Sequence, residues 1–281
     1  MRHPHYRFNH FTHENSNNPP CSSETISGRC TYCITGPSLS GGGPFIFTDT
    51  DFIECKVTEG ECFGGAIDCT SGHLTIKRCS FKQCHSNYRA GAVSFRSNGM
   101  CVQEDNCYLS CSSGFRTGAF DSWDTHKYPS HDHKRCKYMD NSAQNTYPHS
   151  CLEYSSSIKI DSNIYIHGKS SREDRACTVV NYHSKNAVVY ANCLFSNQDA
   201  INTGGLSFMS SFADWIASYS VKFCFFSNSF NADSPTYEIY FDTKSSSYAK
   251  QELIVHCFSL TPNSKVFLQN QSPQEENWLP P

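Results

Sequence analysis

Short segments in which apolar and polar residues alternate recur along most of the chain. They occupy residues 73–77, 158–161, 187–190, 219–223 and 253–256. Alternation with a period of two is typical of β-strands that bury one face. No stretch of 12 or more residues has the apolar spacing of an amphipathic helix. The pattern therefore predicts an all-β protein.

An aromatic residue recurs through the same region at intervals of 27 to 32 residues. A cysteine or asparagine often stands two residues before it, and another cysteine or polar residue often stands three residues after it. The recurring aromatic residues are Phe52, Phe81, Tyr108, Tyr138, Tyr165, Phe195, Phe226 and Phe258. A regular interval of this length indicates a repeat protein.

A second recurring motif, or landmark, follows nearly the same interval as the aromatic residue. It is a pair of small residues followed by an apolar residue, best preserved at residues 64–67 (Gly-Gly-Ala-Ile) and repeated at residues 91–93 and 118–120. Small residues suit a place where the chain turns a corner or where two backbones approach closely. Because the spacings of the two landmarks vary in parallel, together they indicate a repeat more strongly than either landmark alone.

One copy of the repeat is too short to bury its own inward side chains, so the copies must stack. Each copy holds about three short strands, and equivalent strands of stacked copies lie parallel with like residues in columns. The repeat therefore predicts a β-solenoid of about eight coils over residues 44–268. Residues 1–43 form an arm and cap in this interpretation, and residues 269–281 form a loose tail.

Composition and charge exclude several classes of protein. Hydrophobic residues make up 38% of the chain and charged residues 17%, which is not the composition of a disordered chain. The net charge of -3 predicts no general attraction to nucleic acid. No apolar run approaches the ~20 residues that span a bilayer. The first residues lack the apolar stretch of a secretory signal, so we expect a cytoplasmic monomer unless the chain is a fragment of a surface protein.

The 17 cysteines allow two explanations. Many cysteines usually indicate disulfides in an oxidising compartment. Here, however, they recur at fixed positions of the repeat, and cysteine also behaves as a small buried hydrophobic residue. Because no secretory signal is visible, we favour reduced cysteines in inward columns. The predicted column consists of Cys79, Cys136, Cys193 and Cys224.

The two landmarks together resemble the repeats of the polymorphic outer-membrane proteins, which are bacterial autotransporter passenger domains with cysteine-rich relatives in protozoa. Residues 64–67 match the Gly-Gly-Ala-Ile motif, and residues 138–141 (Tyr-Met-Asp-Asn) match its aromatic-x-x-Asn partner. The resemblance covers roughly residues 45–268. It implies a right-handed parallel β-helix of the pectin-lyase-like type and an adhesin-like role.

Pectin-lyase-like folds also include polysaccharide lyases and glycoside hydrolases, so an enzyme must be considered. Glycoside hydrolysis needs a positioned pair of carboxylates. The nearest acidic group is Asp49, Asp51 and Asp68, of which the first two would share one face of a strand. Residues 172–175 (Arg-Glu-Asp-Arg) place acids beside bases. Both groups are typical of solvated surfaces and turns, and no catalytic residue is predicted.

The only dense set of metal-ligand residues is His126, His131, His133 and Cys136. Residues 123–133 are polar and interrupted by proline, so we expect them to project from the solenoid as a loop. His131 and His133 would chelate zinc only if that loop folded back. Cys30 and Cys33 form a single Cys-x-x-Cys without the second pair that a zinc ribbon needs. No metal or cofactor is predicted.

The sequence therefore leads to a non-enzymatic solenoid that presents columns and loops to a protein or glycan partner. The alternative is a divergent polysaccharide lyase or glycoside hydrolase. An enzyme would gather acidic and basic side chains from three adjacent coils, and the sequence does not reveal such a gathering. The projecting loop over residues 123–133 is the expected place for a specific function.

Overall fold

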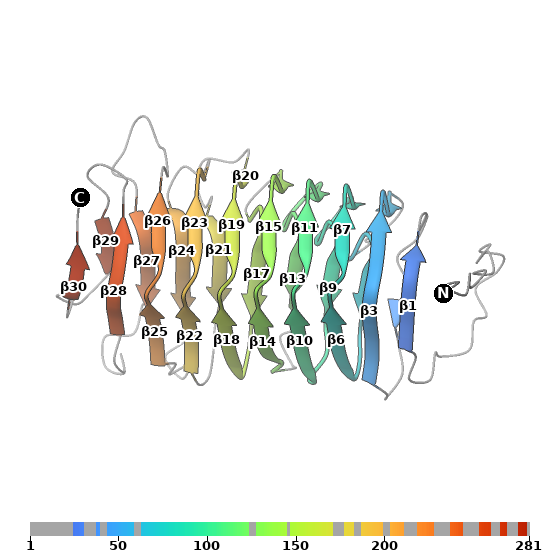
Figure 1. Ribbon diagram of the computed structural model, residues 1–281, viewed down its shortest axis with the longest axis horizontal. Coiled ribbons are helices and arrows are strands. Elements are labelled where there is room, and N and C mark those ends of the chain that lie inside the picture. The colour runs from blue at the N-terminus through green and yellow to red at the C-terminus, as the bar shows by residue number, and fades with distance from the viewer. Residues whose placement is uncertain are drawn as a thin grey trace, which may run out of the picture.

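The computed structural model is a rod of stacked parallel strands, with the N-terminal coils at one end and the C-terminal coils at the other (Figure 1). It describes residues 25–30, 38–39, 44–58, 63–123, 128–144, 147–170, 177–182, 187–198, 203–210, 218–227, 237–243, 253–259, 265–268 and 275–279. Every strand pairing among these residues is parallel, and none of them lies in a helix. The predicted all-β parallel solenoid is confirmed.

The first face of the rod is one continuous ladder that runs from β1 to β30. Its strands are β1 (Thr25–Cys30), β3 (Pro44–Ile53), β6 (His73–Lys77), β10 (Met100–Glu104), β14 (Ser130–Lys134), β18 (Ser157–Asp161), β22 (Ala187–Ala191), β25 (Ser218–Lys222), β28 (Leu253–Ser259) and β30 (Glu275–Leu279). The second face belongs to the same sheet, because β3 and β28 also pair with its end strands. It contains β7 (Ser80–Lys82), β11 (Cys107–Leu109), β15 (Lys137–Met139), β19 (Ile164–Ile166), β23 (Leu194–Ser196) and β26 (Phe225–Ser227).

Two further sheets close the coil. The third face contains β4 (Lys56–Val57), β8 (His85–Ser86), β12 (Ser112–Ser113), β16 (Ser142–Ala143) and β20 (Lys169–Ser170). The fourth face contains β2 (Ser38–Leu39), β5 (Ile67–Cys69), β9 (Val93–Phe95), β13 (Phe120–Ser122), β17 (Ser150–Glu153), β21 (Cys177–Tyr182), β24 (Thr203–Ser210), β27 (Tyr237–Thr243) and β29 (Lys265–Leu268). In Figure 1 the front strands run upward while successive coils advance from right to left, so the coil is right-handed.

The number of coils differs somewhat from the predicted eight. About five turns carry strands on all faces in the described residues, because the third sheet contains only β4, β8, β12, β16 and β20. The number of strands per coil also differs from three, since the first strand of each coil bends into two segments. Strands β1, β2 and β30 extend the ladders beyond the predicted bounds of residues 44–268.

The bend between the first and second faces is made by one residue per coil in the left-handed region. The residues are Asp49, Arg78, Asp105, Arg135, Ser162, Asn192, Phe223 and His256, with φ between 50° and 57°. This conformation costs about 1 kcal/mol for a residue with a side chain. Hydrogen bonds between coils stabilise this conformation, because the corner residues still pair with the next coil. The Arg78 amide donates to the Glu104 carbonyl at 2.9 Å, and the Asp105 amide donates to the Lys134 carbonyl at 3.0 Å.

The Gly-Ala landmark marks the close approach that the sequence predicts. A Cβ atom on Gly91 would lie 2.0 Å from the carbonyl oxygen of Gly118, and one on Gly65 would lie 2.1 Å from that of Gly91. Real Cβ atoms do not come so near to backbone oxygen. Glycine is therefore required here because adjacent coils touch through their backbones.

The predicted aromatic column fills the rod. Seven rings from Phe52 to Phe226 stack coil on coil, with centroids 4.7 to 4.9 Å apart and interplanar angles of 1° to 15°. These rings are buried. The spacing equals that of paired strands, so the ladder register imposes the stacking.

The predicted inward cysteines are also confirmed: Cys79, Cys136, Cys193 and Cys224 are at most 2% exposed. Asparagines occupy the same column in the intervening coils. Asn106 accepts a hydrogen bond from the Cys79 amide at 3.0 Å, and Asn163 accepts one from the Cys136 amide at 2.8 Å. None of the twelve cysteines whose side chains are described forms a disulfide. Burial raises the pKa of Cys136 to about 12, so this thiol stays protonated.

The predicted projecting loop over residues 123–133 is wrong for its second half. Ser130–Lys134 form β14, which pairs with β10 on one side and β18 on the other. His131 and His133 point into the rod and are 2% and 1% exposed. Ladder pairing overrides the polar composition, because the strand has a neighbour in register on both edges. Residues 124–127 lie outside the described part of the chain.

Candidate functional site

The three predicted acidic residues do not converge. Asp49 lies at a corner and is paired with Arg78, which donates at 2.7 and 2.8 Å. Asp51 accepts a hydrogen bond from Ser80 on the second face. Asp68 lies on the fourth face and pairs with Arg96 at 2.6 Å. Asp49 and Asp51 both face outward, on either side of the buried Thr50, but Asp49 lies at the corner with a left-handed φ of 52° and Asp51 lies beyond it.

A different set of charges does converge, on the outer side of the fourth face. We call Arg89, Arg116, Asp121 and Glu153 the outer cluster. Arg89 and Arg116 occupy equivalent positions just before the Gly-Ala landmark of successive coils. Asp121 is in β13 and Glu153 ends β17. Acidic and basic side chains from three adjacent coils therefore meet, as the enzyme alternative requires.

Opposite charges in the outer cluster are paired with one another. Arg116 contacts Glu153 directly, Arg89 Nε lies 3.3 Å from Asp121 Oδ2, and Arg89 Nη2 lies 3.9 Å from Glu153 Oε2. The Arg89 guanidinium also lies 4.0 Å from the ring centroid of Trp123. The two arginines and two carboxylates cancel in formal charge. This pairing compensates the cost of burying each ion.

Burial shifts the two acids toward neutral pH. Desolvation raises the pKa of Asp121 to about 6 and that of Glu153 to about 7, against the opposing attraction of Arg116. Asp121 is 1% exposed and Glu153 is 6% exposed. A general acid needs a raised carboxyl pKa, but these two side chains are buried and paired with arginines.

Beside the outer cluster runs a row of rings, two half-buried and one exposed, that we call the aromatic edge. It consists of Phe63, Tyr88 and Phe115, one from each of three successive coils. The Phe63 and Tyr88 rings meet edge to face at 5.5 Å, and Tyr88 stacks on Phe115 at 5.3 Å. Phe115 is 41% exposed. Arg96 lies 3.8 Å over the Phe63 ring, which links the aromatic edge to the charged face.

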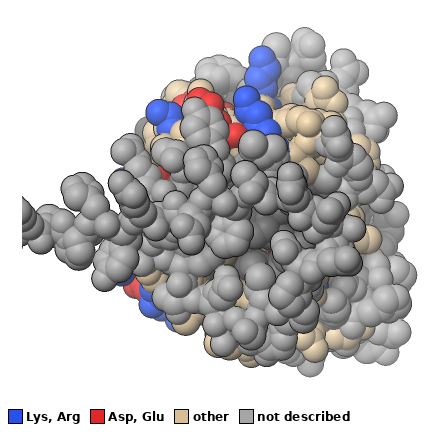
Figure 2. Space-filling model, turned by 90° about the vertical axis from the view of Figure 1, so that its right-hand side faces the viewer, with Lys and Arg blue, Asp and Glu red and all other residues tan. Residues whose placement is uncertain are grey.

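Charges elsewhere on the described surface are mixed. Seen from the N-terminal end, Lys and Arg side chains lie next to Asp and Glu side chains at the rim of the rod (Figure 2). Elsewhere on the described surface, Arg135 forms an ion pair with Asp105 at 2.7 Å. No described residue lies in a helix long and apolar enough to cross a membrane.

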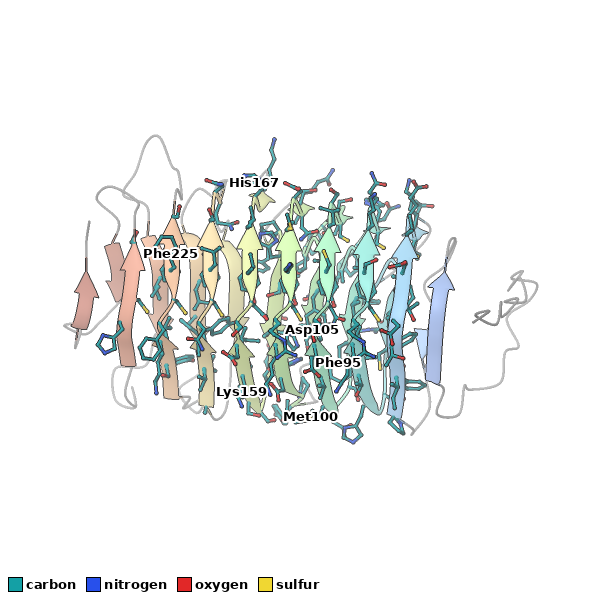
Figure 3. The ribbon with its side chains drawn as sticks, viewed as in Figure 1. Phe95, Met100, Asp105, Lys159, His167 and Phe225 are labelled. Carbon is teal, nitrogen blue, oxygen red and sulfur yellow. The ribbon has the colours of Figure 1, made fainter. Side chains whose placement is uncertain are left out.

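The interior holds a second polar group, and its members include two of the predicted metal-ligand residues. Cys101 of β10 faces the core beside His131 and His133 of β14. One ligand atom from each of these three residues lies within 4.8 Å of the others. Figure 3 shows the side chains that fill the rod and labels Phe95, whose ring is 6.0 Å from that of His131.

Other predicted ligand residues do not join this group. Cys136 is buried at the bend after β14 and donates its amide to Asn163. His126, Cys33 and residues 172–175 lie outside the described residues. Cys30 ends β1, but its side chain is not among those described.

One signal in the sequence places His131 and His133 correctly. The first inward residue of each coil stands five positions before the column of cysteine and asparagine: Leu74 before Cys79, Ile158 before Asn163, and Val188 before Cys193. Counting back from Cys136 gives His131. The outer cluster has a weaker signal: Arg89 and Arg116 each stand two residues before the glycine of the landmark, but Asp121 and Glu153 occupy different positions of the repeat.

Comparisons with known protein families, curated proteins and solved structures find no match to this chain. The fold and the two polar groups are therefore interpreted from their own geometry.

Proposed function

We propose that this chain is a non-enzymatic β-solenoid that binds a glycan along the aromatic edge. The observation that carries the proposal is the row of Phe63, Tyr88 and Phe115 across three coils, in which Tyr88 stacks on Phe115 and Phe115 is 41% exposed. The row presents apolar ring area along the axis of the rod, and the most exposed ring stands at its end. A sugar chain offers apolar C–H faces that pack on such rings.

The third face supports the choice of a glycan over an apolar partner. Outward residues there form a polar row next to the aromatic edge, and His85 Nδ1 lies 2.9 Å from Ser112 Oγ. Other members of the row are Lys56, Ser142 and Lys169. Rings beside hydroxyl, imidazole and ammonium groups match the two-sided chemistry of a sugar, which needs both stacking and hydrogen bonds.

The proposal includes a relationship to a known family of solenoid proteins. The Gly-Gly-Ala-Ile and aromatic-x-x-Asn landmarks support a distant relationship to the polymorphic outer-membrane proteins, and the right-handed coil is consistent with a pectin-lyase-like solenoid. An adhesin-like role follows from that relationship. It agrees with binding along a rod, because stacked coils create an extended surface along the axis.

The test is a glycan and polysaccharide array with the intact chain, followed by analysis of the glycans for cleavage products. Binding without cleavage is expected. Phe115→Ala removes the exposed end of the aromatic edge and should weaken the strongest hit at least tenfold. Phe223→Ala is the matched control, because Phe223 is 55% exposed at a different corner. Equal loss in both variants, or no binding to any glycan, rejects the proposal.

The second candidate is a glycoside hydrolase, favoured by the raised pKa values of Asp121 and Glu153. Its mechanism needs one protonated and one ionised carboxyl group, and the pair supplies both near neutral pH. Cleavage products that disappear in Glu153→Gln, while glycan binding persists, would replace the binding proposal with this one.

A further inference from the structure

We propose that Cys101, His131 and His133 form a buried binding site for a single copper(I) ion inside the solenoid. The three residues come from two neighbouring strands in register, with Cys101 directly opposite His131. All three are buried, and their ligand atoms lie within 4.8 Å of one another. Thiolate and imidazole are the donors that soft first-row ions select.

The strongest observation is His131 itself. Both of its ring nitrogens are buried and neither has a hydrogen-bond partner. Its ring makes T-shaped contacts with Phe95 and Phe120, both at 6.0 Å, and with His133 at 5.4 Å. Buried polar groups in native proteins are almost always satisfied, so an imidazole in this setting indicates a missing partner. A metal ion beside Cys101 and His133 supplies one.

The neighbouring coils show that histidine is not needed for packing. The position of His131 is taken by Leu74 two coils earlier and by Ile158 in the next coil, and that of His133 by Ile76 and Ile160. Between them, Cys101 and Gln103 occupy the same two positions. Two adjacent coils therefore replace four apolar positions by residues that can coordinate or support a metal ion.

Gln103 is the hydrogen-bond partner of the ligand residue His133. Its Nε2 lies 3.3 Å from His133 Nε2, and its Oε1 accepts a hydrogen bond from the Tyr108 hydroxyl at 2.6 Å. Ligating histidines commonly bind the metal through one nitrogen and a hydrogen-bond partner through the other. Binding of the ion through Nδ1 places the His133 proton on Nε2, so in the loaded site the Gln103 amide is turned, with Oε1 accepting from His133 and Nε2 donating to the Tyr108 oxygen.

Charge and ligand number favour copper(I) over zinc(II). A structural zinc site has four protein ligands, whereas three ligand residues converge among the described residues. One thiolate neutralises one copper(I) charge, so the loaded site carries no net charge. The same ligands around zinc(II) would leave a positive charge in an apolar core, which is costly. Bond lengths of ~2.0 Å to nitrogen and ~2.3 Å to sulfur need ligand atoms about 3.5 Å apart, a contraction that side-chain rotation allows.

The site is closed on all sides, so the ion enters while the chain folds. Metal binding of this kind is coupled to folding, and the thiol of Cys101 releases its proton to the solvent when copper(I) replaces it. No oxidation or reduction is involved, because the ion is bound and released as copper(I).

The test refolds the full chain under reducing conditions with copper(I), removes loosely held ion with a competing chelator, and measures copper per chain. Other cysteines also bind copper, so the informative quantity is a difference. His131→Leu should hold one equivalent fewer than the wild-type chain. It restores the residue found at this position in β6 and should fold. Cys136→Ala, at a buried cysteine outside the site, should hold as much copper as the wild type.

X-ray absorption of the loaded chain and its variants supplies a second readout. The equivalent that His131→Leu loses should show one sulfur and two nitrogen neighbours. Equal copper in the wild type and His131→Leu overturns the site, as does a lost equivalent with only sulfur neighbours. A lost equivalent of zinc instead of copper, after refolding with both ions present, overturns the choice of ion. Glycan binding by His131→Leu should equal that of the wild type, which keeps this test separate from the proposed function.

Discussion

The outer cluster and the interior group of Cys101, His131 and His133 are both buried polar sites, yet they differ in how their polar atoms are satisfied. In the outer cluster each carboxylate faces an opposite charge, as Glu153 faces Arg116, although Arg89 Nε, Arg89 Nη1 and Glu153 Oε2 form no hydrogen bond. In the interior group the two nitrogens of His131 form no hydrogen bond, and the ring packs against Phe95 and Phe120. This difference shows that the partners of a buried polar side chain depend on whether it points outward or inward from the coil. Outward side chains reach along the surface to other coils, whereas inward side chains meet only what the ladder register places beside them.

The largest effect is expected from breaking the outer cluster. Glu153→Ala removes one carboxylate and leaves Arg116 and Arg89 short of a counter-charge in a buried site. Breaking such a pair costs about 3–5 kcal/mol of unfolding free energy. Urea unfolding at about pH 8, where Glu153 is ionised, measures it. A loss below about 1 kcal/mol would mean that the cluster is solvated and does not belong in this comparison.

The next effect is a pH dependence that only the outer cluster produces. The folded pKa values of Asp121 and Glu153, about 6 and about 7, lie above their unfolded values of about 4. The folded state therefore binds more protons, and stability is lost as pH rises from about 4 through about 7. Desolvation is the main cause of the shift. Arg116 opposes the rise in both pKa values and Arg96 opposes it at Asp121, whereas the charge of Asp121 adds to the rise at Glu153.

The expected size of this pH effect is at most about 3.5 kcal/mol for Glu153, because its pKa rises from 4.5 to about 7 and each pKa unit corresponds to about 1.4 kcal/mol. Unfolding free energies of the wild type and Glu153→Gln, compared across this window, isolate the contribution. Gln does not titrate, so the slope of stability against pH should be shallower in the variant. An equal slope in both proteins would assign the pH dependence to other groups.

A smaller effect of opposite sign is expected inside the rod. In metal-free protein, His131→Leu removes two unsatisfied nitrogens and fills the space with the residue used at Leu74. Stability should rise by about 1–3 kcal/mol, the usual cost of a buried unsatisfied polar group. Thermal or urea unfolding with a chelator present measures this. A loss of stability would show that His131 packs as a structural residue, and that the contrast with the outer cluster is wrong.

The smallest effect is expected at an exposed ion pair that resembles the outer cluster only in its residue types. Asp49 and Arg78 are bridged at 2.7 Å, but both are more than half exposed. Asp49→Asn removes the charge and keeps a residue that tolerates the left-handed corner. The unfolding midpoint should not change within error. A clear shift would mean that solvent exposure does not separate the two kinds of charge pair.

Much of the architecture was predictable from the sequence because it is periodic. The aromatic column, the glycine corner and the inward cysteines each recur at the coil interval, so that each copy supports the interpretation of the others. The four-segment coil was not predictable in this way. The bend at residues such as Arg78 and Asp105 depends on a backbone conformation that their side chains do not favour, and the ladder imposes it.

The interior group and the outer cluster also differ in how far the sequence predicts them. His131 and His133 follow the inward register when counted back from Cys136, so the sequence contains their placement although their polarity suggests a loop. Their approach to Cys101 is also set by register, since the residues pair across β10 and β14. The outer cluster is a tertiary result. Arg89 and Arg116 are one coil interval apart, but Asp121 and Glu153 occupy different positions of the repeat, and only the stacking of three coils brings the four side chains together. Sequence by itself determines what repeats along one chain, whereas the contacts of outward side chains between coils are decided when the coils pack.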